Sequence, residues 1–186
     1  VCVTSQAIAD DYVRHGLLEP ERFWITGYPQ LDPLLRNLKR GLKAEPRTVL
    51  FAPTYTDGLG SGPLLGPDAV RRIRGGDTTV RVIIRPHPAM VHNAPQLLNA
   101  WRAAAVGANV EYNDDPATDI GQLMARAAVM VSDVLSIALL YLALDRPLVC
   151  IDTGATAAVS GYRAPEGLEW RLHTAADVGT PPPPPP

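Results

Sequence analysis

The strongest constraint on the fold is a regular alternation, from residue 48 onward, of short apolar runs with segments of helical pattern. The apolar runs occupy residues 48–52, 79–84, 109–112, 128–132 and 147–152. The helical patterns occupy residues 68–73, 94–105, 119–126 and 136–144. Strands that are apolar throughout are typical of a parallel sheet that helices cover on both faces. The sequence therefore predicts an α/β fold with a doubly wound, Rossmann-like parallel sheet of at least five strands.

The residues before this alternation read as part of another unit. Strand-like runs at 1–4 and 23–26 alternate with helical patterns at 6–15 and 33–39, and Ser5 and Asp32 are suited to cap the two helices. Residues 41–47 are polar, contain Pro46 and are predicted to be a linker. Because the chain opens inside a strand-like run, we expect residues 1–40 to be the end of a preceding domain with exposed apolar surface.

The main predicted domain spans residues 48–175. Its loop at 53–67 is rich in glycine and proline. Residues 176–186 form a tail that ends in six prolines, which adopt extended polyproline II and cannot continue a packed domain.

Charge and cysteine content narrow the function classes. The chain has 17 basic and 19 acidic residues and a net charge of -2, which argues against nucleic acid as its main partner. Cys2 and Cys150 lie in apolar runs without a second Cys or a His at metal-ligand spacing, so we expect buried free thiols in a reducing compartment. No apolar run reaches the roughly 18 residues of a membrane helix, and no signal peptide is evident. We expect a cytoplasmic protein.

Two places at strand ends carry residues suited to phosphate. In open parallel sheets, ligands bind outside the carboxyl ends of the strands. Residues 52–56 follow the first strand, and the Thr54 hydroxyl or a backbone amide there could meet a phosphate, or could satisfy its own loop. Arg85 and His87 follow the second strand in the sequence Arg-Pro-His-Pro, whose prolines restrict the backbone around the histidine. A charged fork and a hydrogen-bond donor suit a phosphate, and the alternative is a stiff surface loop.

A third place lies where the run at 128–132 gives way to a helix. Ser132 and Asp133 end the run, and Ser136 could cap the helix and, with its first free amides, bind an anion. A carboxylate would repel a phosphate, so Asp133 is expected to order the turn or to reach a ribose hydroxyl or an acceptor. The alternative is a capped helix without a ligand.

Other candidate motifs point to no site. Asp114 and Asp115 are followed by Pro116 and have no third ligand nearby in sequence, which favours a solvated turn over a metal site. His92 is expected to be a surface residue. A Gly-x-Ser-x-Gly elbow, a Gly-x-Gly-x-x-Gly fingerprint and a P-loop lysine are all absent from the sequence. Serine hydrolases of the elbow type, dinucleotide oxidoreductases and ATPases are disfavoured.

The motifs occur in an order that resembles the CDP-glycerol glycerophosphotransferase family, the polymerases and primases of wall teichoic acid and related capsules. The resemblance runs from about residue 3 to about residue 165. The matching motifs are Val3-Thr4-Ser5, Ile25-Thr26-Gly27-Tyr28-Pro29 with Asp32, Leu50-Phe51-Ala52-Pro53-Thr54, Arg85-Pro86-His87-Pro88, Asp119-Ile120 to Met124, Ser132-Asp133 with Ser136, and Asp145-Arg146-Pro147.

The resemblance implies a GT-B fold, in which two Rossmann-like domains face a cleft and the second domain holds the donor without a metal or another cofactor. It implies transfer of a glycerol-phosphate or similar polyol-phosphate unit from a CDP-linked donor to a teichoic-acid or capsule-type acceptor. His87 and Ser136 would meet the donor pyrophosphate, with His87 stabilising it as it leaves. The implied partners are the nucleotide-linked donor, a polymer or lipid-linked acceptor and a missing N-terminal domain. That missing part would carry a basic histidine and a peripheral contact with the inner face of the cell membrane.

The chain departs from the family pattern at the serine cluster. The usual Ser-Asp-Tyr-Ser-Ser has Val134 and Leu135 in place of the tyrosine and the first serine of the pair, and a common acidic position is Leu140 here. Two alternatives follow. One is another GT-B enzyme, a sugar transferase or a nucleotide-sugar 2-epimerase, and the other is a non-catalytic binding module.

Overall fold

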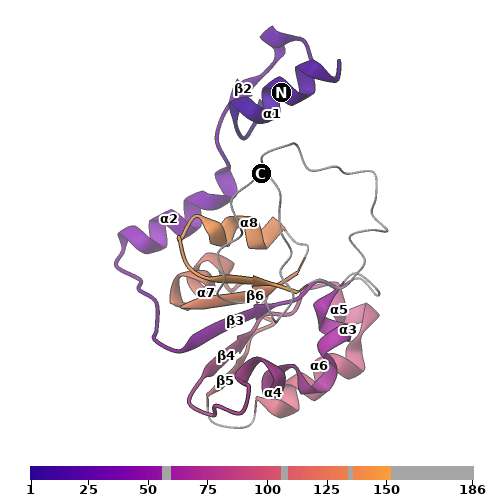
Figure 1. The fold of residues 1–186 in the computed structure, drawn as a ribbon, viewed down its shortest axis with the longest axis vertical. Coiled ribbons are helices and arrows are strands. Elements are labelled where there is room, and N and C mark those ends of the chain that lie inside the picture. The colour runs from indigo at the N-terminus through magenta and orange to yellow at the C-terminus, as the bar shows by residue number, and fades with distance from the viewer. Residues whose placement is uncertain (56–59, 106–108, 134–135, 152–186) are drawn as a thin grey trace, which may run out of the picture.

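The protein is built around one five-stranded parallel sheet (Figure 1). The structure is a computed structural model and describes residues 1–55, 60–105, 109–133 and 136–151. The strands are β3 (Thr48–Ala52), β4 (Arg81–Ile84), β5 (Val110–Tyr112), β6 (Val129–Ser132) and β7 (Leu148–Cys150). Their spatial order is β5-β4-β3-β6-β7, and every neighbouring pair is parallel. The chain therefore changes direction across the sheet between β3 and β6, which is the switch point where such sheets bind ligands.

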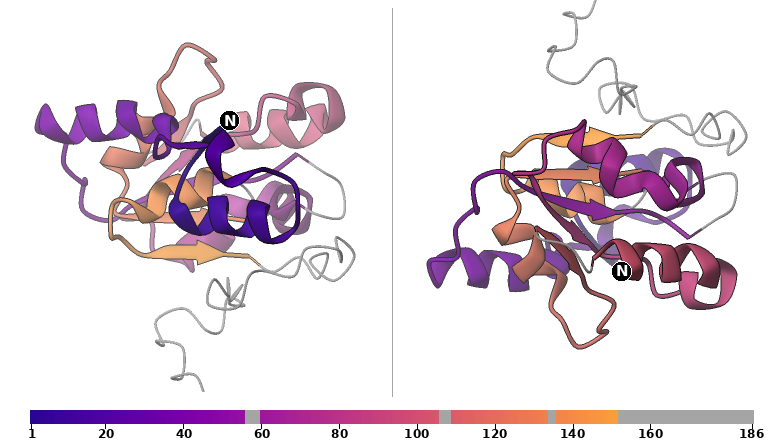
Figure 2. Two further views of the ribbon diagram at one scale, coloured as in Figure 1. Left: turned by 90° about the horizontal axis from the view of Figure 1, so that it is seen from above. Right: turned by 90° about the horizontal axis from the view of Figure 1, so that it is seen from below.

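Helices cover both faces of this sheet (Figures 1 and 2). On one face lie α2 (Asp32–Lys39), α7 (Ile120–Arg126) and α8 (Ser136–Leu142). On the other lie α3 (Ser61–Leu65), α4 (Ala69–Arg74), α5 (Met90–Asn93) and α6 (Pro95–Ala104). The predicted doubly wound, Rossmann-like fold class is confirmed. None of the helices in the described ranges has the length and apolarity needed to span a bilayer.

Successive side chains of each strand enter opposite cores, because strand side chains alternate between the two faces of a sheet. Leu50 of β3 and Ile83 of β4 pack with α2, α7 and α8. Phe51 and Ile84 pack with α4, α5 and α6, where Trp101 is the largest buried side chain. Two-sided burial is the reason that the central strands β3, β4 and β6 are mostly apolar on both of their faces.

The predicted loop at 53–67 is partly helical. Helix α3 lies inside it, followed by a 3₁₀ turn at Gly66–Asp68. Glycine and proline within α3 are poor helix formers, so tertiary contacts hold this short helix in place. A side chain at Gly62 would come within 3.3 Å of Met90 and of Trp101, which shows how closely α3 sits on the core. The short helix α5 was also not predicted.

The amino-terminal residues form a small layer at the top of Figure 1, beyond α2 and α8 as seen from the main sheet. Strands β1 (Cys2–Val3) and β2 (Trp24–Ile25) pair in parallel, and α1 (Gln6–Arg14) connects them with Ser5 as its N-cap, as predicted. Trp24 is 75% exposed and Ile25 is also exposed, which agrees with the expected apolar surface. The prediction of two buried thiols is wrong. Cys2 is exposed because it lies on the face of β1 opposite to Val3, whose side chain is buried, and Cys150 is half-buried on the edge strand β7.

Helix α2 packs with the main sheet rather than with the amino-terminal layer. Leu34 belongs to the core shared with α7 and α8, and the Asn37 side-chain amide donates to the Asp119 carboxylate over 2.8 Å. The same carboxylate group caps α7 by accepting from the Gly121 amide. The domain boundaries predicted at residues 40, 48 and 175 stay predictions. The packing of α2 favours moving the first boundary to before residue 32, and residue 175 lies outside the described ranges.

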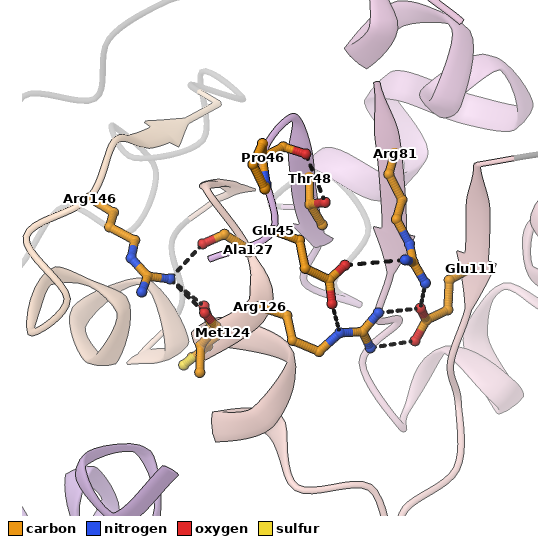
Figure 3. Close-up of polar contacts among 10 residues, drawn as sticks. Glu45, Pro46, Thr48, Arg81, Glu111, Met124, Arg126, Ala127 and Arg146 are labelled. Carbon is orange, nitrogen blue, oxygen red and sulfur yellow. Dashed lines mark hydrogen bonds and ion pairs between the residues drawn. The ribbon is translucent and has the colours of Figure 1, made fainter. Parts of the chain in front are cut away.

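Four alternating charges connect the sheet to its flanking segments near the amino ends of the strands (Figure 3). Glu45 accepts from Arg81 over 3.1 Å and from Arg126 over 2.7 Å. Glu111 accepts from Arg81 over 2.7 Å and from both terminal nitrogens of Arg126 over 3.0 and 2.8 Å. We call Glu45, Arg81, Glu111 and Arg126 the four-charge cluster. It links the segment before β3, the start of β4, the middle of β5 and the end of α7.

Candidate functional site

The three places predicted from strand ends meet in one small cavity at the switch point of the sheet. The cavity has a volume of about 220 Å³. It lies beyond the carboxyl ends of β3 and β4 and beside the first residues of α7 and α8. Its lining residues are Ala52, Pro53, Arg85, Pro86, His87, Pro88, Ile120, Ser136 and Ile137. The structure thus brings His87, Arg85 and Ser136 to one site.

The local backbone fixes the tautomer of His87. The amide of Ala89 donates to His87 Nδ1 over 3.2 Å, so Nδ1 is an acceptor and the proton of the neutral ring is on Nε2. The carbonyl of His87 accepts from the Met90 amide over 2.9 Å and begins the turn into α5. His87 therefore carries an N–H donor that no described hydrogen bond uses, on a ring that the proline-bounded loop holds in place.

The ring of Tyr55 covers His87. The two ring centroids are 4.5 Å apart and the planes are tilted by 31°. Tyr55 also borders a larger open hollow of about 720 Å³. This hollow is further lined by Pro63, His92, Asn93, Ala94, Gln96 and Leu97. His92 is exposed, as predicted for a surface residue, and does not line the small cavity.

Partial burial lowers the pKa of His87 below its ordinary value, and the negative charge of Asp133 opposes this shift. A histidine whose folded-state pKa is lowered binds fewer protons in the folded than in the unfolded protein. Its contribution to stability is therefore present above about pH 6.5 and is lost as the pH falls below that value.

The pH dependence of folding gives a first test. We expect the free energy of unfolding of the unsubstituted chain to fall relative to that of His87→Gln as the pH is lowered from about 7 to about 5. Protonation would also remove the acceptor that the Ala89 amide uses. Urea unfolding of both chains across this range measures the difference. A difference that stays constant, or that grows on acidification, would contradict the pKa direction.

Arg85 reaches the cavity from a fixed position. Its guanidinium donates to the Asn113 side chain over 2.8 Å and to the Asp115 carbonyl over 2.8 Å. These bonds anchor it to the loop after β5. The Asp115 carboxylate accepts from the Ala117 amide over 2.9 Å, and Asp114 pairs with Arg102, so the two aspartates form the expected turn. No group of three potential metal ligands occurs among the residues that the structure describes.

Three of the predicted donor-binding residues make internal contacts instead. The Ser132 hydroxyl donates to the Ala52 carbonyl over 2.7 Å. The Asp133 carboxylate is buried and accepts from Thr54 and Ser61. Thr54 itself is buried and offers its amide to Asp133. In this conformation these side chains hold the strand ends together and do not line the cavity, because the polar groups of buried residues must find partners inside the protein. Their assignment as donor-binding residues stays a prediction, and the hydrogen bonds of Asp133 are those expected of a residue that orders the turn.

At the serine cluster, where the chain departs from the family pattern, Ser136 lies at the surface and Leu140 lies in the core. Ser136 is exposed and lines the cavity. Leu140 is buried in the core under α8, so its position offers no carboxylate to a ligand. Val134, Leu135 and the predicted Thr56 contact lie outside the described residues. Tyr55 belongs to the predicted segment 52–56, but its contact with His87 was not foreseen, and Ser61 was not predicted at all. Both contacts join residues that are distant in the chain, because His87 follows β4 and Asp133 follows β6.

Comparison with known proteins agrees with this geometry. The wall teichoic acid polymerase TagF superposes with a TM-score of 0.57 at 15% identity, over 87% of this chain and 41% of that one. The UDP-GlcNAc 2-epimerase of Neisseria meningitidis gives a TM-score of 0.54 at 15% identity, over 82% of this chain and 45% of that one. The chain thus spans less than half the length of these solved proteins, and the likeness shows the predicted GT-B-type fold. No curated protein matches the sequence.

A family model identifies the chain more specifically than the fold does. The model for CDP-Glycerol:Poly(glycerophosphate) glycerophosphotransferase matches residues 12–155. This match includes every strand of the main sheet and all the residues of the small cavity. The resemblance inferred from the ordered motifs is confirmed, and the chain belongs to the CDP-glycerol glycerophosphotransferase family.

Proposed function

We propose that this chain supplies the donor-binding part of a transferase that moves a glycerol-phosphate or similar polyol-phosphate unit from a CDP-linked donor to a teichoic-acid or capsule-type acceptor. The observation that supports it most is the free Nε2–H of His87 in a cavity at the switch point, together with Arg85 and Ser136. Such crevices hold phosphates in doubly wound folds. The three groups offer a neutral donor, a cation and a hydroxyl, a set suited to a diphosphate.

In the proposed reaction, an acceptor hydroxyl attacks the phosphorus of the glycerol phosphate. A new phosphorus–oxygen bond forms to the acceptor, and the bond to the bridging oxygen of CMP breaks. Negative charge then grows on the leaving phosphate, where His87 would donate Nε2–H and Arg85 would add a positive charge. We assign the base that takes the acceptor proton to a preceding domain. In keeping with the family resemblance, we propose that the transfer requires no metal or other cofactor.

Solved relatives of similar fold carry ligands of the same chemical class. A TagF variant was soaked with CDPG, and the meningococcal epimerase is bound to UDP-GlcNAc. A nucleoside diphosphate is common to these ligands. For this chain we propose a CDP-linked donor and a polymer or lipid-linked acceptor, used at the cytoplasmic face of the cell membrane.

Binding measurements test the proposal and separate it from the alternatives. We expect CDP and CDP-glycerol to bind this chain and to bind more tightly than UDP or UDP-GlcNAc in isothermal titration calorimetry. Preference for the uridine ligands would favour the sugar-transferase or epimerase alternative. If none of the four nucleotides binds, the alternative of a non-catalytic binding module would be favoured.

Substitution of His87 gives the residue-level prediction. His87→Ala should weaken CDP binding by about 1–3 kcal/mol, a factor of roughly 5 to 150, because it removes a hydrogen bond to a charged group. His92→Ala is the matched control, since His92 is exposed and lines only the larger hollow. We expect the control to bind CDP as the unsubstituted chain does. Equal effects of the two substitutions on the dissociation constant would remove His87 from the site.

A further inference from the structure

The buried carboxylate of Asp133 is held by groups from the segment that follows β3. It is 1% exposed. Its Oδ2 accepts from the Thr54 amide over 2.9 Å, from the Ser61 amide over 2.7 Å and from the Ser61 hydroxyl over 2.7 Å. Its Oδ1 accepts from the Thr54 amide over 3.1 Å. One side chain at the end of β6 therefore fixes residues on both sides of 56–59.

This arrangement requires an acceptor at both carboxylate oxygens. Backbone amides can only donate, and they approach Asp133 from Thr54 and from Ser61. An asparagine of the same shape would place its NH₂ group against at least one of these donors. None of the ion pairs within the described ranges involves Asp133. A buried carboxylate without a paired cation is expensive unless hydrogen bonds replace its water, and here the strand-end loop supplies them.

The held segment touches His87 directly. Tyr55 follows Thr54, and its ring lies 4.5 Å from that of His87 between centroids. The His87 ring is also fixed at its Nδ1 atom by the hydrogen bond from the Ala89 amide. Two contacts thus orient the imidazole, one from its own loop and one from Tyr55. The contact from Tyr55 depends on Asp133, because Asp133 holds the neighbouring residue Thr54 in place.

We propose that Asp133 is a positioning residue that acts through Tyr55: by holding the Thr54 amide it keeps the tyrosine ring against His87, and so directs Nε2–H into the cavity. Asp133 itself does not touch the donor in this account. The consequence for binding rests on the proposed function, whereas the orientation of His87 does not. The two are therefore tested separately.

The first test needs no ligand. In ¹H–¹³C spectra of the histidine rings, the Tyr55 ring should shift the His87 signals, and Tyr55→Leu should remove this shift. Asp133→Asn should move the His87 signals in the same direction. Ser61→Ala keeps the three hydrogen bonds from the backbone amides of Thr54 and Ser61 and should move the His87 signals part of the way. Ser5→Ala, at the cap of the remote helix α1, is the matched control and should move nothing.

Unchanged His87 signals in Asp133→Asn would overturn the proposal. If Asp133→Asn does not fold, Ser61→Ala decides the matter, since it removes one of the four bonds and leaves the rest. His87 signals that stay in place in Ser61→Ala, or that move away from those of Tyr55→Leu, would equally overturn it.

The second test distinguishes positioning from direct contact with the donor. Asp133→Asn should weaken CDP binding about tenfold in the unsubstituted background and hardly at all in the His87→Ala background. Two residues that act through one group are not additive in a double-mutant cycle. Additive losses would show that Asp133 contributes independently of His87. If the unsubstituted chain does not bind CDP, the proposed function fails while the ring-shift test still decides the positioning.

Discussion

Replacing Trp101 by alanine is expected to lower the free energy of unfolding by about 3–5 kcal/mol. The Trp101 side chain is fully buried on the face of the sheet covered by α4, α5 and α6. It meets Phe51 of the central strand edge to face, with ring centroids 5.5 Å apart. Its indole N–H donates to the Gly66 carbonyl over 3.0 Å. The substitution removes a large apolar contact and also leaves a carbonyl without its donor.

Trp24 supplies the control for this prediction. It is 75% exposed on β2, so Trp24→Ala should change the free energy of unfolding by about 0.5 kcal/mol or less. Urea unfolding followed by far-UV circular dichroism measures both variants without relying on tryptophan fluorescence. A loss below about 1.5 kcal/mol for Trp101→Ala would show that the core around α3 and α6 closes over the gap.

The second large effect is expected at the four-charge cluster. Arg126→Met should lower the free energy of unfolding by about 2 kcal/mol, because it takes three charge-assisted hydrogen bonds from Glu45 and Glu111. The cluster is partly exposed, which keeps the expected loss below that of a fully buried pair. Figure 3 shows that Arg81 alone would then face both carboxylates.

The acid limb of the stability profile checks this assignment. Hydrogen bonds from Arg126 lower the pKa of Glu111, so the stabilisation is present above about pH 4.5 and is lost as the pH falls below it. The difference in unfolding free energy between the unsubstituted chain and Arg126→Met should therefore narrow below about pH 4.5. The control is Arg71→Met, because Arg71 and its partner Asp68 are 71% and 57% exposed. An exposed pair contributes little, so equal losses from the two substitutions would contradict the role of the cluster.

The sequence was sufficient for features that depend on local pattern. Thr48–Ala52 forms the predicted strand, and the order of the five strands with α4, α6, α7 and α8 follows from the apolar runs and the helical patterns. The sequence could predict those residues of the candidate site that directly follow the carboxyl ends of strands or begin the next helix. Arg85, His87 and Ser136 come together because the carboxyl ends of parallel strands share one edge of the sheet.

Features that depend on partners distant in the chain could not be predicted in this way. The Asp133 side chain meets Thr54, 79 residues away, and Arg126 meets Glu45, 81 residues away. No local pattern shows which of several polar residues will be buried against such a partner. For this reason the sequence could place Ser132 and Asp133 near the predicted ligand but could not show which internal groups they would bind.

The position of β3 at the centre of the sheet also determines when the chain can complete its fold. Strand β3 is the first strand of the main sheet to be made, yet it pairs with β4 on one side and with β6 on the other. The hydrogen bond from the Ser132 hydroxyl to the Ala52 carbonyl joins two residues that are 80 positions apart in the chain. During synthesis one edge of an apolar strand stays unpaired until β6 has left the ribosome, and an unpaired edge is a template for aggregation. Such distant parallel pairing makes folding slow, so low expression temperature and chaperone supply should determine the soluble yield of this chain.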